Sequence, residues 1–222
     1  MKRIFPRTDL YCLTDYALSL GRSNLEVTRE LLAAGVKLIQ YREKDRPMGL
    51  RLEECLAIRG LTREAGACFI VNDHVDIALL ADADGVHIGQ DDLPAEAVRR
   101  LIGPDRIIGV STHAPEQAKA ALAAGADYIG AGPVFATKTK EDVCAPVGLE
   151  YLAWAAQNIP LPIAAIGGLS PANLRAAALA GAGCFALVSA IVAQPDIRAA
   201  VSEARAALGA AFTPPGPARP GD

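Results

Sequence analysis

The chain has 222 residues, of which 51% are apolar, so it can bury a substantial core in one large domain or two small ones. Its net charge is −3 and it contains no run of basic residues, which argues against a protein that follows a nucleic-acid backbone. The first residues, MKRIFPRTDLYCLTD, lack the apolar core of a signal peptide, so we expect a cytoplasmic protein.

A helix end, a glycine and an apolar run recur along the chain, as in LLAAGVKLIQ from Leu31 and ALAAGADYIG from Ala121. Glycine after the last helical residue adopts the left-handed conformation that closes a helix, and the apolar run is typical of a buried strand. Helix and strand therefore alternate through the chain, which predicts a parallel sheet.

Eight strands are predicted, and this number favours a closed (β/α)8 TIM barrel. In chain order they span residues 9–14, 37–44, 68–73, 85–89, 107–111, 128–132, 162–168 and 184–190. Helices are predicted over residues 25–34, 53–65, 115–124, 149–157, 171–180 and 197–211. A doubly wound sheet stays open as the alternative, although GAGCFA at 181–186 lies between a helix and a strand, the reverse of the order that a dinucleotide fingerprint requires.

A single barrel domain is predicted over residues 1–212, and the tail TPPGPARPGD over 213–222 is expected to be disordered because it is rich in proline and glycine. Residues 176–193 carry no charge and approach the length of a membrane span. Gly181 and Gly183 interrupt this segment, so we predict a helix end followed by a buried strand instead.

The second predicted strand ends in QYREK, which places Gln40, Arg42 and Lys44 on one face because strand side chains alternate. If that face meets solvent, the two cations need no further explanation. If it faces a cavity, they form an anion site, because buried cations without a partner are costly. This stretch alone leaves both interpretations open.

Polar residues also follow several other strands, at the end of a barrel where active sites lie. They are Asn72 and Asp73, GQDD at 89–92, Ser111 and GPVFATKTK at 132–140. Asp73 and Asp92 follow adjacent strands, and a carboxylate pair beside cations predicts a Mg²⁺ that also binds phosphate. Either aspartate alone would more readily be explained as the cap of the following helix.

The loops after the last two strands predict a second anion site. Ser170 precedes Pro171, a pattern typical of a helix N-cap that leaves backbone N–H groups free. Val188 and Ser189 follow the eighth strand, and barrels commonly hold a monophosphate on these two loops. One site is therefore expected to be cationic and the other neutral.

Seven motifs in order resemble the motif set of the thiamine phosphate synthase family. They are QYREK (40–44), VNDHVDIAL (71–79), GVHIGQDD (85–92), GVSTH (109–113), GPVFATKTK (132–140), AIGGLS (165–170) and LVSAI (187–191). The resemblance implies a Mg²⁺-dependent transferase that joins 4-amino-2-methyl-5-hydroxymethylpyrimidine diphosphate to a thiazole phosphate. The products would be thiamine phosphate and pyrophosphate, after dissociative loss of the diphosphate.

The resemblance also implies a role for individual residues. The pyrimidine diphosphate would be bound by Gln40, Arg42, Lys44, Asn72, Ser111 and Lys140, with Tyr41 and Glu43 as further substrate-binding candidates. The thiazole phosphate would be bound by Thr137, Lys138, Thr139, Gly168, Val188 and Ser189, and Mg²⁺ by Asp73 and Asp92. Arg42, Lys44, Ser111 and Lys140 are the expected catalytic residues, while His87 is expected to be a hydrogen-bonded core histidine.

Two other functions remain open from the sequence. A thiazole tautomerase on the same barrel would use one phosphorylated substrate and would not need both the cations and the carboxylate pair. A non-catalytic barrel that binds phosphorylated metabolites would need only the neutral loops. The polar loop ATKTKEDVCAPVG at 136–148 is too long for a simple turn, and we expect it to close over the substrates with Lys140.

Overall fold

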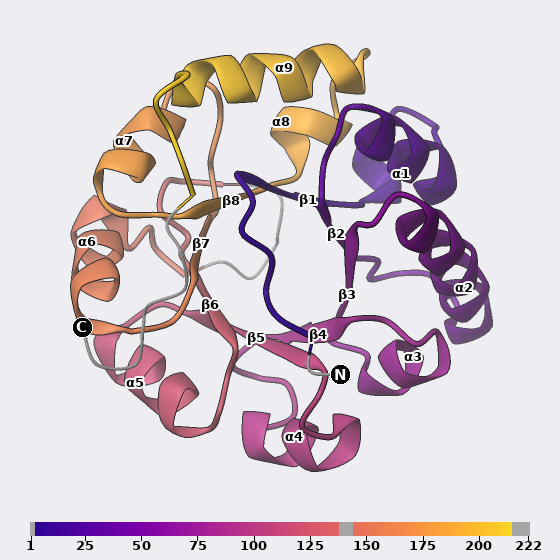
Figure 1. Cartoon of the computed structure of the whole chain (residues 1–222), viewed down its shortest axis with the longest axis horizontal. Helices are drawn as coiled ribbons and strands as arrows, with labels where there is room; N and C mark the ends of the chain where they lie inside the picture. Colours follow the sequence, from indigo (N-terminus) through magenta and orange to yellow (C-terminus); the bar gives the residue numbers. More distant parts are fainter. Residues whose placement is uncertain (1–2, 138–143, 215–222) are drawn as a thin grey trace.

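Eight short parallel strands close into a barrel in the order β1 to β8, with helices around the outside (Figure 1). The computed structural model describes residues 3–137 and 144–214. The strands are β1 (Leu10–Leu13), β2 (Leu38–Tyr41), β3 (Cys68–Asn72), β4 (Gly85–Ile88), β5 (Ile107–Thr112), β6 (Tyr128–Ala131), β7 (Ile163–Ile166) and β8 (Cys184–Leu187). This arrangement confirms the predicted (β/α)8 barrel.

The helices alternate with the strands along the chain, as the recurring helix–glycine–strand pattern predicts. They are the 3-10 turn η1 (Tyr16–Leu18) and the α-helices α1 (Asn24–Ala33), α2 (Met48–Glu64), α3 (Val75–Leu80), α4 (Ala95–Ile102), α5 (Pro115–Ala123), α6 (Gly148–Asn158), α7 (Leu174–Leu179), α8 (Ser189–Val192) and α9 (Ile197–Leu208). Within the two described ranges, no helix is both long enough and apolar enough to cross a membrane.

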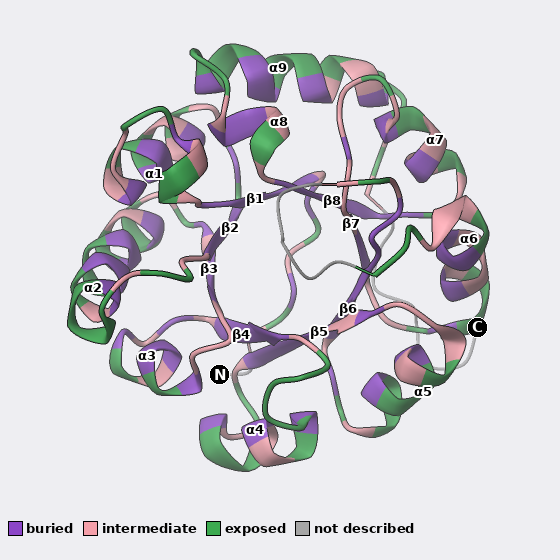
Figure 2. Ribbon diagram, turned by 180° about the vertical axis from the view of Figure 1, so that it is seen from behind, coloured by how far each residue is buried: buried purple, intermediate pink, exposed green. Residues whose placement is uncertain are grey.

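Alternate side chains of each strand face the barrel interior and the surrounding helices. The outer set, which includes Ile39, Val71 and Ile129, forms one large buried cluster with the apolar faces of the helices. The inner set, which includes Leu38 and Tyr128, forms a separate and smaller cluster. Figure 2 accordingly shows buried strands inside a ring of helices that carry both buried and exposed residues.

Two glycines make room for large rings inside the barrel. A Cβ atom at Gly109 would lie 2.0 Å from Cζ of Tyr128, and one at Gly130 would lie 3.1 Å from Cε1 of His87. A side chain at Gly109 would therefore overlap the tyrosine ring, and one at Gly130 would press on the imidazole. These positions let the Tyr128 and His87 side chains occupy the barrel interior.

The segment before β1 crosses the N-terminal end of the barrel (Figure 1). Its Phe5 ring stacks on Tyr128 with the ring centroids 4.1 Å apart. Arg3 donates its backbone N–H to the carbonyl oxygen of Asp105 at 2.8 Å and pairs with the Asp82 carboxylate at 2.8 Å. These contacts close the end of the barrel that lies opposite the expected site.

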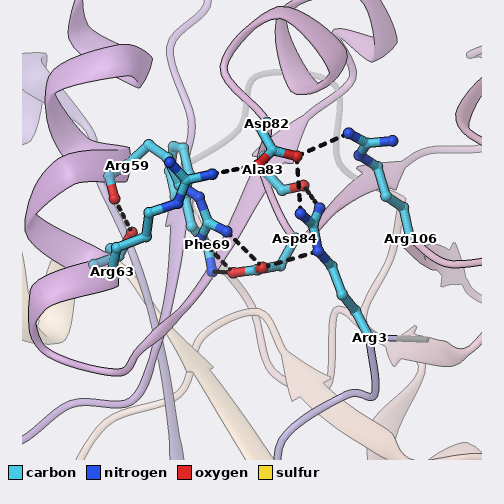
Figure 3. Close-up of polar contacts among 9 residues, drawn as sticks. Arg3, Arg59, Arg63, Phe69, Asp82, Ala83, Asp84 and Arg106 are labelled. Atoms are coloured by element: carbon cyan, nitrogen blue, oxygen red, sulfur yellow. Dashed lines mark hydrogen bonds and ion pairs between the residues drawn. The ribbon is translucent and has the colours of Figure 1, made fainter. Parts of the chain in front are cut away.

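Two aspartates on the turn between α3 and β4 bind four arginines there (Figure 3). Asp84 accepts two hydrogen bonds from Arg59, at 2.7 and 3.0 Å. Asp82 pairs with Arg3, Arg63 and Arg106. The hydrogen bond from Arg3 is the main reason why the pKa of Asp82 is lowered. The network ties the N-terminal segment to α2 and to the α3–β4 turn.

Seven predicted strands are longer than the observed ones, and three of them continue two or more residues past the observed end. β2 ends at Tyr41 instead of residue 44, because the Arg42 N–H donates to the Thr14 hydroxyl at 3.1 Å and not to a neighbouring strand. β7 ends at Ile166, because Gly167 has a φ of 92° that leaves the extended region. β8 ends at Leu187, and α8 begins two residues later.

Helix boundaries also differ from the prediction. α2 begins at Met48, five residues before the predicted start at 53. Ser170 is not the observed cap, because α7 begins at Leu174 and its N-cap is Asn173. Ser170 instead starts the turn before α7, in which its carbonyl oxygen accepts from the N–H groups of Asn173 and Leu174. α9 ends at Leu208, because Gly209 adopts a φ of 84°. Most of the predicted tail, 215–222, lies outside the described residues.

We expect Asp84→Asn to lower the free energy of unfolding by about 3 kcal/mol, because it leaves the Arg59 guanidinium buried without a charged partner. The side chains of this pair are only 10% and 16% exposed. Glu30→Gln is the matched control, since it breaks the exposed pair with Arg198 and should cost less than about 1 kcal/mol. Urea unfolding of both variants measures the difference, and equal losses would contradict the importance of the buried pair.

Candidate active site

A cavity opens at the C-terminal ends of the strands, where the sequence predicts the site. Six predicted substrate-binding residues line it: Arg42, Ser111, Thr137, Gly168, Val188 and Ser189. Apolar walls come from Leu13, Pro133 and Ile166. The cavity therefore joins the cationic strand-two side to the neutral loops after β7 and β8, as expected for a site that takes two ligands. Lys138, Thr139 and Lys140 lie outside the described residues.

The Asp73 and Asp92 carboxylates lie close to each other and within electrostatic reach of Arg42, which lines the cavity. Asp73 takes a φ of 61° and donates its N–H to the His87 carbonyl oxygen at 2.8 Å, while Asp92 Oδ2 accepts from the Gly89 N–H at 2.7 Å. The two carboxylates are close enough for the negative charge of Asp92 to raise the pKa of Asp73. Helix α4 begins after Pro94 without a side-chain cap, so Asp92 does not have the capping role that was its alternative explanation.

The charge balance around the pair is uneven. Burial and then the negative charge of Asp92 raise the pKa of Asp73 well above its ordinary range, and the cations of Lys44 and Arg42 only partly oppose this. Two close carboxylates that repel one another are an oxygen donor set for a divalent cation. The described residues hold no group of three or more acidic, histidine or cysteine ligands. The pair therefore fits Mg²⁺, which typically uses one or two carboxylates and takes its other ligands from water or phosphate.

Arg42 and Lys44 are held in different ways. The Arg42 guanidinium pairs with Asp15 at 2.9 Å, and both side chains are only 13% exposed. Lys44 is exposed. Its carbonyl oxygen accepts from Arg51, which also donates to the Arg46 carbonyl oxygen at 2.7 Å. Arg51, which the sequence analysis did not single out, thus fixes the loop that carries Lys44.

The two residues that flank Arg42 make their side-chain contacts within the protein. Tyr41 faces away from the interior and donates its hydroxyl to Glu54 on α2 at 2.6 Å. The Glu43 carboxylate accepts from the Tyr16 N–H at 2.8 Å and so holds the turn after β1. Gln40 points into the barrel interior, where it is 2% exposed. Asn72 ends β3 and is half-buried.

The neutral side of the cavity is built by close backbone packing. Gly168 has a φ of 65°, and a Cβ atom there would lie 2.5 Å from the carbonyl oxygen of Ala136. Ser189 begins α8 directly after Val188. Gly168 also lines the cavity, and its backbone, which carries no side chain, borders the space for a ligand. His113 also lines the cavity and its Nδ1 donates to the Gly132 carbonyl oxygen, a contact that no sequence pattern indicated.

Below the cavity, a line of hydrogen bonds crosses the barrel interior from Gln40 to Ser111. It passes through the Tyr11 and Tyr128 hydroxyls and the His87 ring. Both ring nitrogens of His87 are engaged, and burial lowers its pKa to about 4. The expectation of a hydrogen-bonded core histidine is confirmed. The tyrosines were missed, although Gly109 and Gly130 at alternate strand positions are a signal for space inside the barrel.

The family model described as thiamine monophosphate synthase matches residues 10–191. The chain belongs to this family. A thiamine-phosphate synthase of Pelotomaculum thermopropionicum is 59% identical over 200 residues, covering 90% of this chain and 92% of its own. One from Lawsonia intracellularis is 54% identical over 205 residues, covering 92% and 94%. A solved thiamine phosphate pyrophosphorylase from Pyrococcus furiosus has a TM-score of 0.83 and 38% identity, covering 90% and 95%.

These matches confirm the resemblance drawn from the seven motifs, and thiamine phosphate synthesis is the activity of this chain. They give no support to the tautomerase or to the non-catalytic barrel. A solved 3-hexulose-6-phosphate synthase with 22% identity and a TM-score of 0.67 shares the fold alone. The barrel therefore serves other reactions too, and the function of this chain depends on its site residues.

We expect Asp73→Asn to stabilise the metal-free protein at pH 7.5 by about 1–2 kcal/mol. A carboxyl group whose folded pKa is raised destabilises the fold once pH rises above its unfolded pKa, and the amide removes that charge. The gain should grow from about pH 4 upward and vanish below it. Urea unfolding in excess EDTA measures it, with the exposed Asp91→Asn as a control of no more than about 0.5 kcal/mol. A gain that persists at pH 3 would contradict the charge explanation.

Proposed function

We propose that this synthase joins 4-amino-2-methyl-5-hydroxymethylpyrimidine diphosphate to a thiazole phosphate, with Mg²⁺ held by Asp73 and Asp92. The observation that carries the proposal is the division of charge around one cavity. The carboxylate pair lies beside Arg42 and Lys44 on one side, and the backbone at Gly168 borders the other. A metal-assisted diphosphate suits the first side and a monophosphate the second.

On the charged side, the diphosphate would lie between the Arg42 guanidinium and the Lys44 ammonium group. When bound, Mg²⁺ would neutralise charge on the diphosphate and favour its departure. Arg42 is already oriented by Asp15 at 2.9 Å, so it need not be ordered when the ligand binds. Lys44 is exposed and can move toward the ligand.

The bond changes need no nucleophile from the protein. The C–O bond between the pyrimidine methylene group and the diphosphate breaks, and its electron pair leaves with the diphosphate. The electron-rich aminopyrimidine supports the resulting cation, and the lone pair of the thiazole nitrogen then forms the new C–N bond. The apolar walls formed by Leu13, Pro133 and Ile166 would keep water away from this cation. The protein thus contributes position, charge and exclusion of water.

On the neutral side, the thiazole phosphate would bind at Gly168, Val188, Ser189 and Thr137, all of which line the cavity. Hydroxyl and backbone N–H donors can hold a phosphate there without a cation. This arrangement keeps the monophosphate away from the metal and leaves the charged side to the diphosphate. The thiazole ring would then lie between the two sides, toward the pyrimidine.

The direct assay is release of pyrophosphate by the purified protein when both substrates are present. We expect none with either substrate alone. A tautomerase would change the thiazole phosphate without the pyrimidine and release no pyrophosphate. A binding protein would bind ligands and release no product, so the assay separates the three functions.

Catalysis should require a divalent cation and the carboxylate pair. We expect Asp92→Asn to lower turnover by about 100-fold or more and to remove the dependence on Mg²⁺ concentration, because one of its two protein ligands is lost. Asp91→Asn, next in the chain and exposed, should keep both near the wild-type values. Steady-state rates across a Mg²⁺ titration measure this. Full activity in excess chelator would remove the metal from the mechanism.

Adding a methyl group at Gly168 should weaken binding of the thiazole phosphate on the neutral side of the cavity. We expect Gly168→Ala to raise KM for the thiazole phosphate by about tenfold or more, while KM for the pyrimidine diphosphate changes less than about threefold. Gly66→Ala is a matched control, since Gly66 has a similar φ of 58° but no atom within 4 Å of an added Cβ. A selective effect on the pyrimidine diphosphate would mean that the two sites are exchanged.

A further inference from the structure

Four hydrogen bonds connect Gln40 to Ser111 through the closed interior of the barrel. Gln40 Nε2 donates to the Tyr11 hydroxyl at 2.5 Å, and the Tyr11 and Tyr128 hydroxyl oxygens are 2.9 Å apart. The Tyr128 hydroxyl lies 2.8 Å from His87 Nδ1, and His87 Nε2 lies 2.9 Å from Ser111 Oγ. The chain of contacts joins β2, β1, β6, β4 and β5, so it spans the barrel from one wall to the other.

Each hydroxyl, and the imidazole when neutral, has one proton to donate. With Gln40 as the first donor, every proton finds an acceptor along the line only if all the bonds run in the same direction. The Tyr11 hydroxyl accepts from Gln40 and donates its own proton to Tyr128. Tyr128 then donates to His87 Nδ1. A neutral imidazole that accepts at Nδ1 carries its proton on Nε2, and it donates that proton to Ser111 Oγ.

Burial keeps every member of the line in the required protonation state. The His87 ring is neutral in this arrangement because its Nδ1 accepts from Tyr128, and its burial lowers its pKa, which acts in the same direction. Desolvation also raises the pKa of Tyr11 and of Tyr128, so both hydroxyls keep their protons. Among the described residues, Asp92 opposes the lowering of the His87 pKa, with a smaller effect than burial.

The two ends of the line are left with opposite hydrogen-bonding capacity. Ser111 Oγ accepts from His87, so its own proton is free to point into the cavity that Ser111 lines. Gln40 uses its nitrogen on Tyr11, which leaves its Oε1 as the acceptor at this end of the line. The site therefore offers a donor at Ser111 and an acceptor at Gln40.

We propose that Tyr11, Tyr128 and His87 are positioning residues that make Ser111 a donor and Gln40 an acceptor toward the pyrimidine ring, and so select an aminopyrimidine. This inference rests on the proposed function for the identity of the ring. An amino group donates to Gln40, and a ring nitrogen accepts from Ser111. A 4-oxopyrimidine carries a carbonyl oxygen and a ring N–H instead, so its donor and acceptor are exchanged. To place a donor opposite that carbonyl oxygen, the Gln40 amide would have to turn, and Tyr11 would then have to donate to it, which reverses the bonds that follow.

The first experiment determines, without any substrate, which atoms donate and which accept along the line of hydrogen bonds. NMR of the protein with ¹⁵N-labelled histidine distinguishes the two neutral tautomers and the cation, and His74→Gln and His113→Gln variants assign the signals. We expect His87 to be the neutral Nε2–H tautomer from pH 6 to 8. An Nδ1–H tautomer, or a protonated ring in this range, would overturn the proposal. Because no ligand is added, this result is independent of the proposed function.

The second experiment measures selectivity as the ratio of kcat/KM for the 4-amino and the 4-oxo pyrimidine diphosphates. We expect Tyr128→Phe to lower this ratio by about tenfold or more, since the ring stays packed on Phe5 while the line is cut. Tyr11→Phe removes the hydroxyl that lies between Gln40 and Tyr128 and should lower the ratio by a similar factor. This variant provides a second test if Tyr128→Phe folds poorly. KM for the thiazole phosphate should change less than about threefold.

Tyr151→Phe is the matched control. Its hydroxyl is also buried and donates to Thr112 Oγ1 at 2.8 Å, but on the helix side of the barrel and apart from the line. An equal loss of selectivity in Tyr151→Phe and Tyr128→Phe would overturn the proposal. If the wild-type protein releases no pyrophosphate at all, the proposed function fails instead, and the tautomer of His87 still tests the direction of the line.

Discussion

The close approach of two carboxylates, Asp73 and Asp92, is the interaction on which the site depends. Each is fixed by a bond to the backbone, Asp73 through its own N–H and Asp92 through the N–H of Gly89, so the pair cannot easily separate. Their repulsion and the burial of Asp73 are unfavourable for the free protein, as the raised pKa of Asp73 shows. Such a pair is favourable only when a cation lies between the carboxylates, which links the stability of this region to the ligands that it binds.

Charged side chains are arranged differently at the two ends of the barrel. At the N-terminal end, Arg59 and Asp84 form a complete bidentate pair that closes the structure (Figure 3). At the C-terminal end, Lys44 is exposed and the carboxylate pair repels itself, so charges are left to be satisfied by ligands. Stability and binding are thus separated along the barrel axis, in keeping with other barrels of this fold. The interior between them is sealed by Tyr128, for which Gly109 leaves room.

The sequence predicted the barrel because helix ends, glycines and apolar strands repeat locally, and it predicted Arg42 and Ser111 at the cavity because strand ends in a barrel meet there. It did not predict that β2 stops at Tyr41, since that depends on a bond from Arg42 to Thr14, on the preceding strand. Nor could it show the contact between Tyr11 and Tyr128, which depends on the register of β1 and β6 across a closed barrel. The alternation of residues along a strand predicts which face of the sheet a side chain lies on. Which side chain it contacts across the barrel depends on how the eight strands close.

In the proposed site, one cavity holds a metal-bound diphosphate and a monophosphate on opposite sides. A crystal structure of the protein with thiamine phosphate, pyrophosphate and Mg²⁺ would show this arrangement directly. We expect a metal ion ligated by Asp73 and Asp92, pyrophosphate beside Arg42, and the phosphate of thiamine phosphate against Gly168 and Ser189. Pyrophosphate bound at Gly168 and Ser189, or a metal ion bound away from the carboxylate pair, would contradict it.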